Sequence, residues 1–284
     1  MRLLDNPELK RIIRNALEED VKEGDHTSLA CIPHDATGKA KLLVKDNGIL
    51  AGIPVAIAVF AEVDSSLEMD IDIEDGTAVK KGDIAFEVSG SAISILTAER
   101  IVLNCMQRMS GIATLTNRYV QAIKGTKAKV IDTRKTTPGI RLLEKYAVTV
   151  GGGANHRMGL YDMIMIKDNH VDFSGGIAQA IDRTHQYLKS KNLDLQIEVE
   201  TRNLDEVKQV LDRGGIDRIM LDNFTPEVMK NAVDMIQGRF ETEASGGIVL
   251  ETIRSYAETG VDFISVGALT HSATSLDLSL KATF

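Results

Sequence analysis

The sequence is poor in cysteine and lacks long hydrophobic runs. Cys31 and Cys105 lie far apart and provide neither a disulfide framework nor the CxxC spacing of a zinc site, so we expect both to be reduced and structural. No apolar run approaches the roughly 18 residues of a membrane span, and the charged segment 1–28 lacks the apolar core of a signal peptide. We therefore expect no membrane association and a cytoplasmic location.

Positive charge is also scarce. The chain has 33 lysines and arginines against 41 aspartates and glutamates, which gives a formal net charge of −8. This balance disfavours a nucleic-acid partner, because such proteins bind by neutralising many phosphates. There is no GxxxxGK[ST] segment either, which excludes a P-loop nucleotide site.

The positive charge that is present gathers in one stretch. Residues 132–157 read DTRKTTPGIRLLEKYAVTVGGGANHR and contain more basic than acidic side chains. In an acidic protein such a stretch indicates a site for a small anionic ligand. Arg141 and Lys145 fall on a helical pattern and are expected to face solvent, whereas GGGANHR either closes over a ligand or is a plain connector.

The chain has two regions that differ in their pattern of apolar and polar residues. Residues 9–17 place apolar side chains at helical spacing, residues 38–94 contain short alternating runs separated by glycine turns, and a long helix is expected over 97–124. After it, strand-like runs alternate with helical patterns; the six runs are AKVIDTRK, YDMIMIKDNH, LQIEVET, DRIMLDNFTPE, FETEASGGI and DFISVGALTHS. This alternation is typical of parallel βα units, but the remaining length is too short for a complete eight-stranded barrel.

Each of these runs ends in a chemically capable residue. In chain order they are Arg134 with Lys135, Lys167, Glu200, Asp222, Ser245, and Gly267 with His271. Because the carboxyl ends of parallel barrel strands converge on one mouth, we expect these residues to meet in space.

One side of the predicted mouth is suited to a sugar phosphate. Glu200 and Asp222 suit Mg²⁺ held through water, or a pair of ribose hydroxyls. Residues 244–247, ASGG, precede a helix and can hold a phosphate with backbone N–H groups, and residues 266–271, VGALTH, can form a second wall. Both segments can equally be plain βα turns.

The other side is basic. Arg134 with Arg157 suits a planar poly-carboxylate, because a guanidinium binds a carboxylate through two parallel hydrogen bonds. Lys135 with Lys167 suits phosphates. A lone basic residue is usually a solvated surface charge, but four at predicted strand ends or in the adjoining loop favour an anion site.

The segment DTRKTTPGIRLLEKYAVTVGGGANHRMGLYDMIMIKDNH resembles the quinolinate phosphoribosyltransferases, also called carboxylating nicotinate-nucleotide pyrophosphorylases. IEVET, MLDN, EASGG and SVGALTHS agree with this family in order, and GDHTS is similar to its first-domain signature. The resemblance implies an α/β protein with an N-terminal α/β open sandwich and a seven-stranded open α/β barrel of the type II phosphoribosyltransferase kind. We expect the sandwich over 1–110, the barrel over 111–272, and a tail, 273–284, that packs back on the first domain.

The resemblance also implies the reaction. Quinolinate and 5-phosphoribosyl-1-pyrophosphate would become nicotinate mononucleotide, pyrophosphate and CO₂ in NAD biosynthesis, with Mg²⁺ as cofactor. Quinolinate would be bound by Arg100, Arg134, His156, Arg157 and Lys167. The phosphoribosyl donor would be bound by Lys135, Glu200, Asp222, Ser245, Gly246, Gly247, Gly267 and His271.

The resemblance gives some of these residues further roles. Lys135, Lys167, Glu200 and Asp222 would form the catalytic set, with the last two holding the metal directly or through water. Arg100 is similar to an arginine that the family lends to the neighbouring subunit, which implies at least a homodimer with shared active sites.

Two alternatives remain at this point. A group associated with molybdenum transport shares the fold, and release of CO₂ from quinolinate distinguishes the enzyme from it. A non-catalytic sensor of pyridine carboxylates is the other alternative, although a sensor would not need the phosphate loops together with Glu200 and Asp222.

Overall fold

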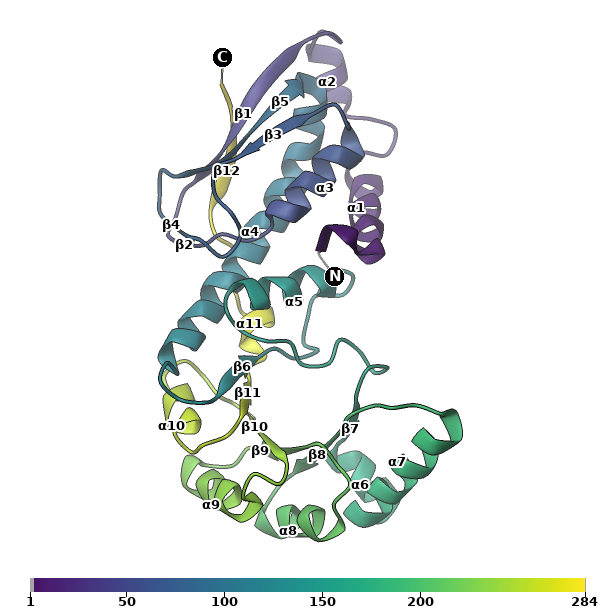
Figure 1. The fold of residues 1–284 in the computed structure, drawn as a ribbon. Coiled ribbons are helices and arrows are strands. Elements are labelled where there is room, and N and C mark those ends of the chain that lie inside the picture. The colour runs from purple at the N-terminus through teal and green to yellow at the C-terminus, as the bar shows by residue number, and fades with distance from the viewer. Residues whose placement is uncertain (1–2, 284) are drawn as a thin grey trace. The chain divides into compact units, whose positions relative to one another are not determined.

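The structure, a computed structural model, describes residues 3–283, which fold into two compact units (Figure 1). The first unit is built from Met1–Asn117, Thr136–Gly152 and Leu269–Phe284, and the second from Arg118–Lys135 and Gly153–Ala268. Among residues 3–283, no helix combines the length and the hydrophobicity that a bilayer span requires.

The first unit is centred on an antiparallel sheet with strand order β12-β1-β5-β3. Its strands are β1 (Thr37–Val44), β3 (Glu68–Ile71), β5 (Ile84–Ser91) and β12 (Leu278–Thr283), and β2 (Gly48–Ile49) pairs separately with β4 (Ala78–Val79). The helices that begin in this unit are η1 (Leu3–Asp5), α1 (Pro7–Asp20), α2 (His26–Cys31), α3 (Ile53–Val63), α4 (Ala92–Ala122) and α5 (Arg141–Val150). The final strand, β12, pairs with β1 in antiparallel register, with Leu280 opposite Leu42.

Several local predictions for this unit are confirmed. The N-terminal helix buries Leu9, Ile12 and Ile13 as its apolar spacing predicted, and the long helix is α4. Helix α3 was not predicted, because its sequence IPVAIAVFAEV is apolar on nearly every side and shows no helical period. The carboxylate of Asp75 accepts the N–H groups of Gly52 and Ile53 and so caps the start of α3 from a distant loop.

The second unit contains a parallel sheet of six strands in the order β6-β11-β10-β9-β8-β7. They are β6 (Lys129–Ile131), β7 (Ile164–Ile166), β8 (Ile197–Thr201), β9 (Arg218–Asp222), β10 (Glu241–Ser245) and β11 (Phe263–Ser265), so all six predicted runs are confirmed. The helices are α6 (Asp168–Ser174), α7 (Ile177–Lys191), α8 (Leu204–Arg213), α9 (Pro226–Ile236) and α10 (Ile253–Ala257), and α11 (Ala268–His271) begins at the boundary between the units. Figure 1 shows the strands as an arc with α7, α8 and α9 on its outer side.

The parallel sheet is open, and in place of a seventh strand the described residues form a single β-bridge. Where the resemblance implies seven strands, the described residues form six, and a single parallel bridge joins Ile131 of β6 to Ala154. The N–H of Ala154 donates to the carbonyl of Val130, and the N–H of Asp132 donates to the carbonyl of Ala154. The glycine-rich segment before Ala154 disfavours a longer strand, because glycine weakens strand interiors.

Candidate active site

The ends of β7, β8 and β9 bring three predicted site residues together. Nζ of Lys167, just after β7, donates to Oε2 of Glu200 in β8 at 2.7 Å. Glu200 is buried at 7% exposure. Burial and the negative charge of Glu200 raise the pKa of Asp222 at the end of β9, while Lys167 acts in the opposite direction. The predicted meeting of strand ends therefore holds for this trio.

The next strand end adds a hydroxyl and a glycine turn. Ser245, at the end of β10, hydrogen-bonds Asp222, and its carbonyl accepts the N–H of Asn223 at 2.9 Å. Gly246 has φ of 97°, and a Cβ there would lie 2.8 Å from the backbone nitrogen of Asn223 and overlap its side chain. Gly247 has φ of 61° but open space around it. Only glycine fits at position 246 without displacing the turn that follows Asp222.

Two arginines form the basic side of the site. Arg134, beyond β6, is exposed, and Arg157 is half-buried with Nη1 donating to the carbonyl of Met163 at 3.1 Å. Burial and the positive charge of Arg134 lower the pKa of Arg157. Two guanidinium groups that repel each other in a partly buried setting favour an anion between them. Lys135, the neighbour of Arg134, is exposed.

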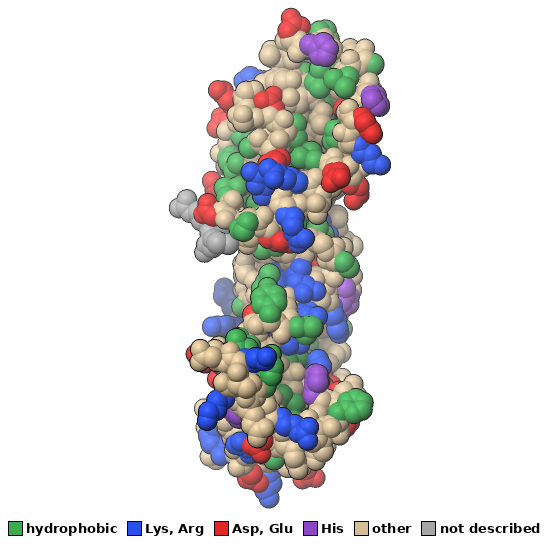
Figure 2. Space-filling model, turned by 90° about the vertical axis from the view of Figure 1, so that its right-hand side faces the viewer, with side chains coloured by type: hydrophobic (Ala, Val, Ile, Leu, Met, Phe, Trp, Pro, Cys, Tyr) green, Lys and Arg blue, Asp and Glu red, His purple; other side chains and the backbone are tan. Residues whose placement is uncertain are grey.

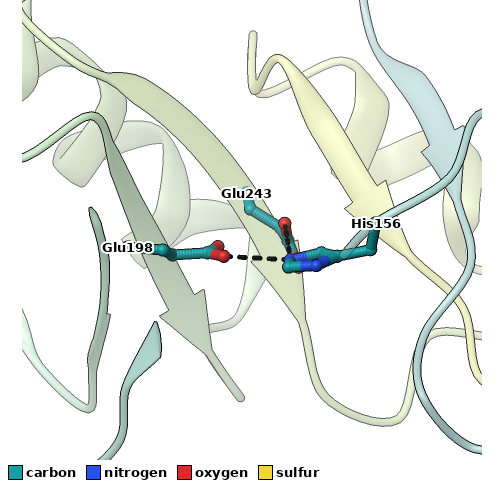
Figure 3. Close-up of side chains that lie close together, drawn as sticks. All are labelled: His156, Glu198 and Glu243. Atoms are coloured by element: carbon teal, nitrogen blue, oxygen red, sulfur yellow. Dashed lines mark hydrogen bonds and ion pairs between the residues drawn. The ribbon is translucent and has the colours of Figure 1, made fainter. Parts of the chain in front are cut away.

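The imidazole of His156 lies elsewhere, in the interior of the same unit. Its Nε2 is 2.9 Å from Oε2 of Glu198 and 3.2 Å from Oε2 of Glu243, and these side chains reach it from β8 and β10 (Figure 3). Its Nδ1 accepts the backbone N–H of Arg157 at 2.7 Å. The sequence groups His156 with the arginines, but the structure surrounds its ring with carboxylates.

This interior cluster is strongly coupled. Burial lowers the pKa of His156, but the hydrogen bonds and charges of Glu198 and Glu243 outweigh it and raise that pKa to about 9. Burial and the charge of Glu243 raise the pKa of Glu198 to about 7. The raised pKa values of His156 and Glu198 have the same consequence: near neutral pH the cluster keeps a proton that the isolated side chains would lose. So high a pKa would by itself make His156 an imidazolium near neutral pH, but Nδ1 accepts the Arg157 N–H and therefore carries no proton. The geometry thus keeps the ring neutral with its proton on Nε2, and the additional proton of the cluster lies on a carboxyl group, in line with the raised pKa of Glu198.

Arg218 adds a positive charge to this cluster through Glu243. Its Nη1 donates to Oε2 of Glu243 at 3.1 Å and its Nη2 to Oε2 of Glu241 at 2.9 Å. The guanidinium carbon also lies 4.0 Å from the ring centre of Phe263, a cation–π contact. Arg218 thus neutralises part of the negative charge of the buried Glu243 and the exposed Glu241 on β10.

Two predicted residues belong to the first unit. Arg100, on α4, is exposed, with its guanidinium 4.0 Å from the carboxylate of Glu99. His271, at the end of α11, is also exposed, and its Nδ1 lies 2.7 Å from Oγ of Ser272. Gly267, in contrast, belongs to the second unit, two residues beyond β11.

The prediction that Arg141 and Lys145 face solvent is wrong. Lys145 is fully buried on α5, and Arg141 is half-buried with Nε donating to Oγ1 of Thr136 at 2.8 Å. Beside Lys145, the buried carboxylate of Glu144 accepts from Arg108 and from the N–H and hydroxyl of Thr137. Helix α5 therefore anchors the TTPG loop instead of displaying a charged surface.

Glu200 and Asp222 have the chemistry of a magnesium site. Both offer carboxylate oxygens, the ligands that Mg²⁺ prefers, and the mutual charge that raises the pKa of Asp222 would be relieved by a cation. The residues present therefore fit the predicted metal.

Sequence reasoning missed Glu198, Glu243 and Arg218. A signal was available, since IEVET and ETEAS carry glutamates at alternate positions and RIMLD carries a charged residue at each end. In a strand, alternate residues share a face, so Glu198 lies on the face of Glu200, and Glu243 on that of Ser245.

The chain is similar to known proteins over nearly its whole length. The family models described as quinolinate phosphoribosyl transferase, N-terminal domain and C-terminal domain, match residues 25–110 and 112–281. The decarboxylating quinolinate phosphoribosyltransferase 1b of Nicotiana tabacum is 50% identical over 289 residues, which cover 96% of this chain and 82% of the relative. A probable carboxylating nicotinate-nucleotide pyrophosphorylase of Bacillus subtilis is 40% identical, with 97% and 94% covered.

A solved structure shares the fold. The nicotinate-nucleotide pyrophosphorylase from Francisella tularensis superposes with a TM-score of 0.91 at 39% identity, and the match covers 100% of both chains.

Proposed function

The chain belongs to the quinolinate phosphoribosyltransferase family, and on that premise we propose the part that each residue of its site plays in the reaction. It is a decarboxylating phosphoribosyltransferase of NAD biosynthesis, which converts quinolinate and 5-phosphoribosyl-1-pyrophosphate to nicotinate mononucleotide, pyrophosphate and CO₂. The observation that carries the residue assignment is the division of the site into mutually repelling arginines on one side and a carboxylate pair on the other.

Arg134, Arg157 and Lys167 bind the two carboxylates of quinolinate. The repulsion between the two arginines supports this, because a dianion placed against them relieves it. A single carboxylate would leave much of the positive charge of the three cations uncompensated, so we assign them a dicarboxylate and not nicotinate.

Glu200 and Asp222 bind the ribose side of the donor. Ser245, Gly246, Gly247 and Gly267 hold the 5′-phosphate at the ends of β10 and β11, and Lys135 faces the pyrophosphate. His271, which belongs to the first unit, stays a prediction from the family resemblance. The open space at Gly247 and the lack of any side chain at both glycines support close approach of a phosphate to the backbone. Glu200 and Asp222 would also hold Mg²⁺, which when bound supplies positive charge against the pyrophosphate.

Fixed charges account for the chemistry. The ring nitrogen of quinolinate attacks the anomeric carbon as pyrophosphate leaves, so negative charge develops on the leaving oxygens near Lys135 and positive character on the ribose near Glu200 and Asp222. Holding both substrates in register supplies much of the rate enhancement. The ribosylated nitrogen is cationic and stabilises the electron pair left on the adjacent carbon when CO₂ departs, after which a proton from water takes its place.

The working molecule is a homodimer in which Arg100 serves the partner's site. Hydrophobic side chains surface in several places on the face drawn in Figure 2, and among the described residues the most exposed large ones are Phe173, Tyr161 and Leu160, at 91, 74 and 71%. Leu160 and Tyr161 are neighbours in the chain, and adjacent exposed hydrophobic side chains of this kind support contact with a second copy of the chain. We place the enzyme in the cytoplasm, which fits its two free cysteines.

Incubation of the protein with quinolinate, the phosphoribosyl donor and Mg²⁺ tests this function. We expect nicotinate mononucleotide to form, and we expect nicotinate in place of quinolinate to be a poor substrate. Comparable turnover of nicotinate would contradict the assignment of the three cations to a dicarboxylate.

A further inference from the structure

Both ring nitrogens of His156 are engaged before any substrate binds. Nε2 lies within hydrogen-bond distance of Glu198 and Glu243, and Nδ1 accepts the N–H of Arg157. The side chain is only 4% exposed. A substrate carboxylate would reach this ring only by displacing one of these partners.

The contacts fix one tautomer of the ring. A nitrogen that accepts an N–H bond uses its lone pair and carries no proton. Nδ1 of His156 is therefore the acceptor, and Nε2 carries the proton and donates toward the two glutamates. Glu198 and Glu243 thereby select both the tautomer and the orientation of the ring.

We propose that His156 is a positioning residue that acts on quinolinate through Arg157: Glu198 and Glu243 orient its ring, and its Nδ1 holds the backbone of Arg157. The inference rests on the proposed function, in which Arg157 binds quinolinate. Arg157 is held at both ends, since its guanidinium donates to the carbonyl of Met163 at 3.1 Å.

A second hydrogen bond fixes the preceding peptide group. The N–H of His156 donates to Oδ1 of the buried Asp132 at 2.9 Å, so the peptide groups on both sides of His156 bind side chains. These two hydrogen bonds fix the backbone at residues 156 and 157, and so they fix the position of the Arg157 Cα from which its side chain extends.

Stability alone does not explain the glutamates. The Oε1 atoms of Glu198 and Glu243 are buried and have no hydrogen-bond partner within residues 3–283. Buried carboxylates with an unsatisfied oxygen destabilise a core relative to apolar side chains of the same size. Orientation of the His156 ring gives these carboxylates a function that offsets their cost.

The same three side chains are close enough together to hold a metal cation. A cation would need the lone pair of Nε2, whereas this nitrogen lies at hydrogen-bond distance from both carboxylates. Arg218 already supplies positive charge to Glu243. The arrangement therefore favours a proton on Nε2 over a metal.

Nitrogen NMR of the protein labelled with ¹⁵N-histidine tests the tautomer without any assay of activity. We expect one ring, identified by its loss in His156→Gln, to carry its proton on Nε2, with Nδ1 unprotonated, both before and after quinolinate is added. A protonated Nδ1, an Nε2 bound to metal, or transfer of the ring's hydrogen bond to quinolinate would overturn the proposal. Because this readout needs no turnover, it stands even if the proposed function fails.

A double-mutant cycle tests the action through Arg157. In His156→Gln the amide reaches the position of Nε2 but leaves no acceptor at that of Nδ1, so we expect about a tenfold rise in KM for quinolinate with kcat and the donor KM little changed. Arg157→Lys should give a rise of similar size. The double variant should show no more than the larger single effect, and multiplication of the two would mean that His156 contacts substrate itself.

Two variants on β10 provide a matched pair that does not alter His156. Glu243→Gln weakens the hold on Nε2 and should raise KM for quinolinate selectively. Glu241→Gln, two residues earlier, also removes a carboxylate partner of Arg218 but does not touch His156, and should leave KM unchanged. Equal effects in the two variants, or a loss of thermal stability in Glu243→Gln without any change in KM, would overturn the proposal.

Discussion

Nζ of Lys167 lies 2.7 Å from Oε2 of Glu200, so a cation assigned to quinolinate and a carboxylate assigned to ribose hold each other before either substrate binds. Lys167 is the more accessible member, with its side chain 46% exposed against 8% for Glu200. The pair therefore joins the two halves of the site.

This contact predicts an asymmetric response to substitution. Glu200→Ala releases Lys167, so quinolinate binding without donor should be unchanged or tighter, while use of the donor should fall by one to two decades, as for loss of about 1.5–3 kcal/mol. Calorimetric titration with quinolinate, together with the donor KM and kcat, measures both. Lys135→Ala, which removes an exposed cation on the donor side, is the matched comparison and should also spare quinolinate binding. A large loss of quinolinate affinity in Glu200→Ala would show that the site is divided differently.

The turn after β10 predicts a contrast between two adjacent glycines. Gly246→Ala places a methyl group against the backbone of Asn223 and should abolish donor binding or lower the melting temperature markedly. Gly247→Ala meets no protein neighbour, so its cost to stability should be only that of the left-handed backbone, about 1–2 kcal/mol, while its methyl group occupies space that the phosphate needs and should raise the donor KM. Thermal unfolding and the donor KM of both variants check this. Indistinguishable variants would contradict the geometry of the turn.

Asp262 predicts a stability effect that depends on pH. Its carboxylate accepts from Nζ of Lys127 and from the N–H and hydroxyl of Thr242, which tie the start of β10 to the segment before β11. Burial acts to raise its pKa, but these hydrogen bonds outweigh burial and lower it.

Because the folded pKa lies below the unfolded one, the stabilisation is present above the unfolded pKa and is lost as pH falls through the folded pKa. Asp262→Asn should therefore lower the free energy of unfolding by about 1–2 kcal/mol at pH 7 and by much less once the pH lies below the folded pKa of Asp262. Urea denaturation at the two pH values measures the difference. A gap between the proteins that stays constant with pH would contradict the role of the charge.

The exposed position of Arg100 on α4 predicts complementation between inactive chains. Arg100→Ala mixed with Lys167→Ala should regain activity after subunit exchange, because a mixed dimer has one site lacking both groups and one site intact. With equal amounts and random exchange, about a quarter of wild-type activity per site should return. If exchange is verified by mass and activity stays at the level of the single variants, Arg100 does not serve the partner's site.

The strand ends of the second unit could be predicted because each buried strand is visible in the local sequence as a short run with apolar residues that ends in a polar or charged residue. Strand β8 is buried along its whole length: its apolar residues Ile197 and Val199 alternate with Glu198 and Glu200, and Glu200 lies near its carboxyl end. Helix α3 was not predicted because nearly all of its residues are apolar. Without polar residues at regular positions, the sequence shows no 3.6-residue helical periodicity.

The interior cluster could not be assembled from the sequence alone. Glu198 and Glu243 lie on strands separated by a third, β9, and which residues face each other depends on the register of all three strands. The burial of Lys145 is of the same kind, because a helical pattern shows which residues share a face but not what covers that face.

The most direct test of the whole account uses quinolinate labelled with ¹³C in its 2-carboxylate. With the phosphoribosyl donor and Mg²⁺ present, we predict labelled CO₂, pyrophosphate and nicotinate mononucleotide in equal amounts, and no labelled CO₂ when the donor is omitted, because the carboxylate leaves only after the ring nitrogen has become cationic. Release of labelled CO₂ without the donor, or a ribosylated product that retains the label, would contradict it.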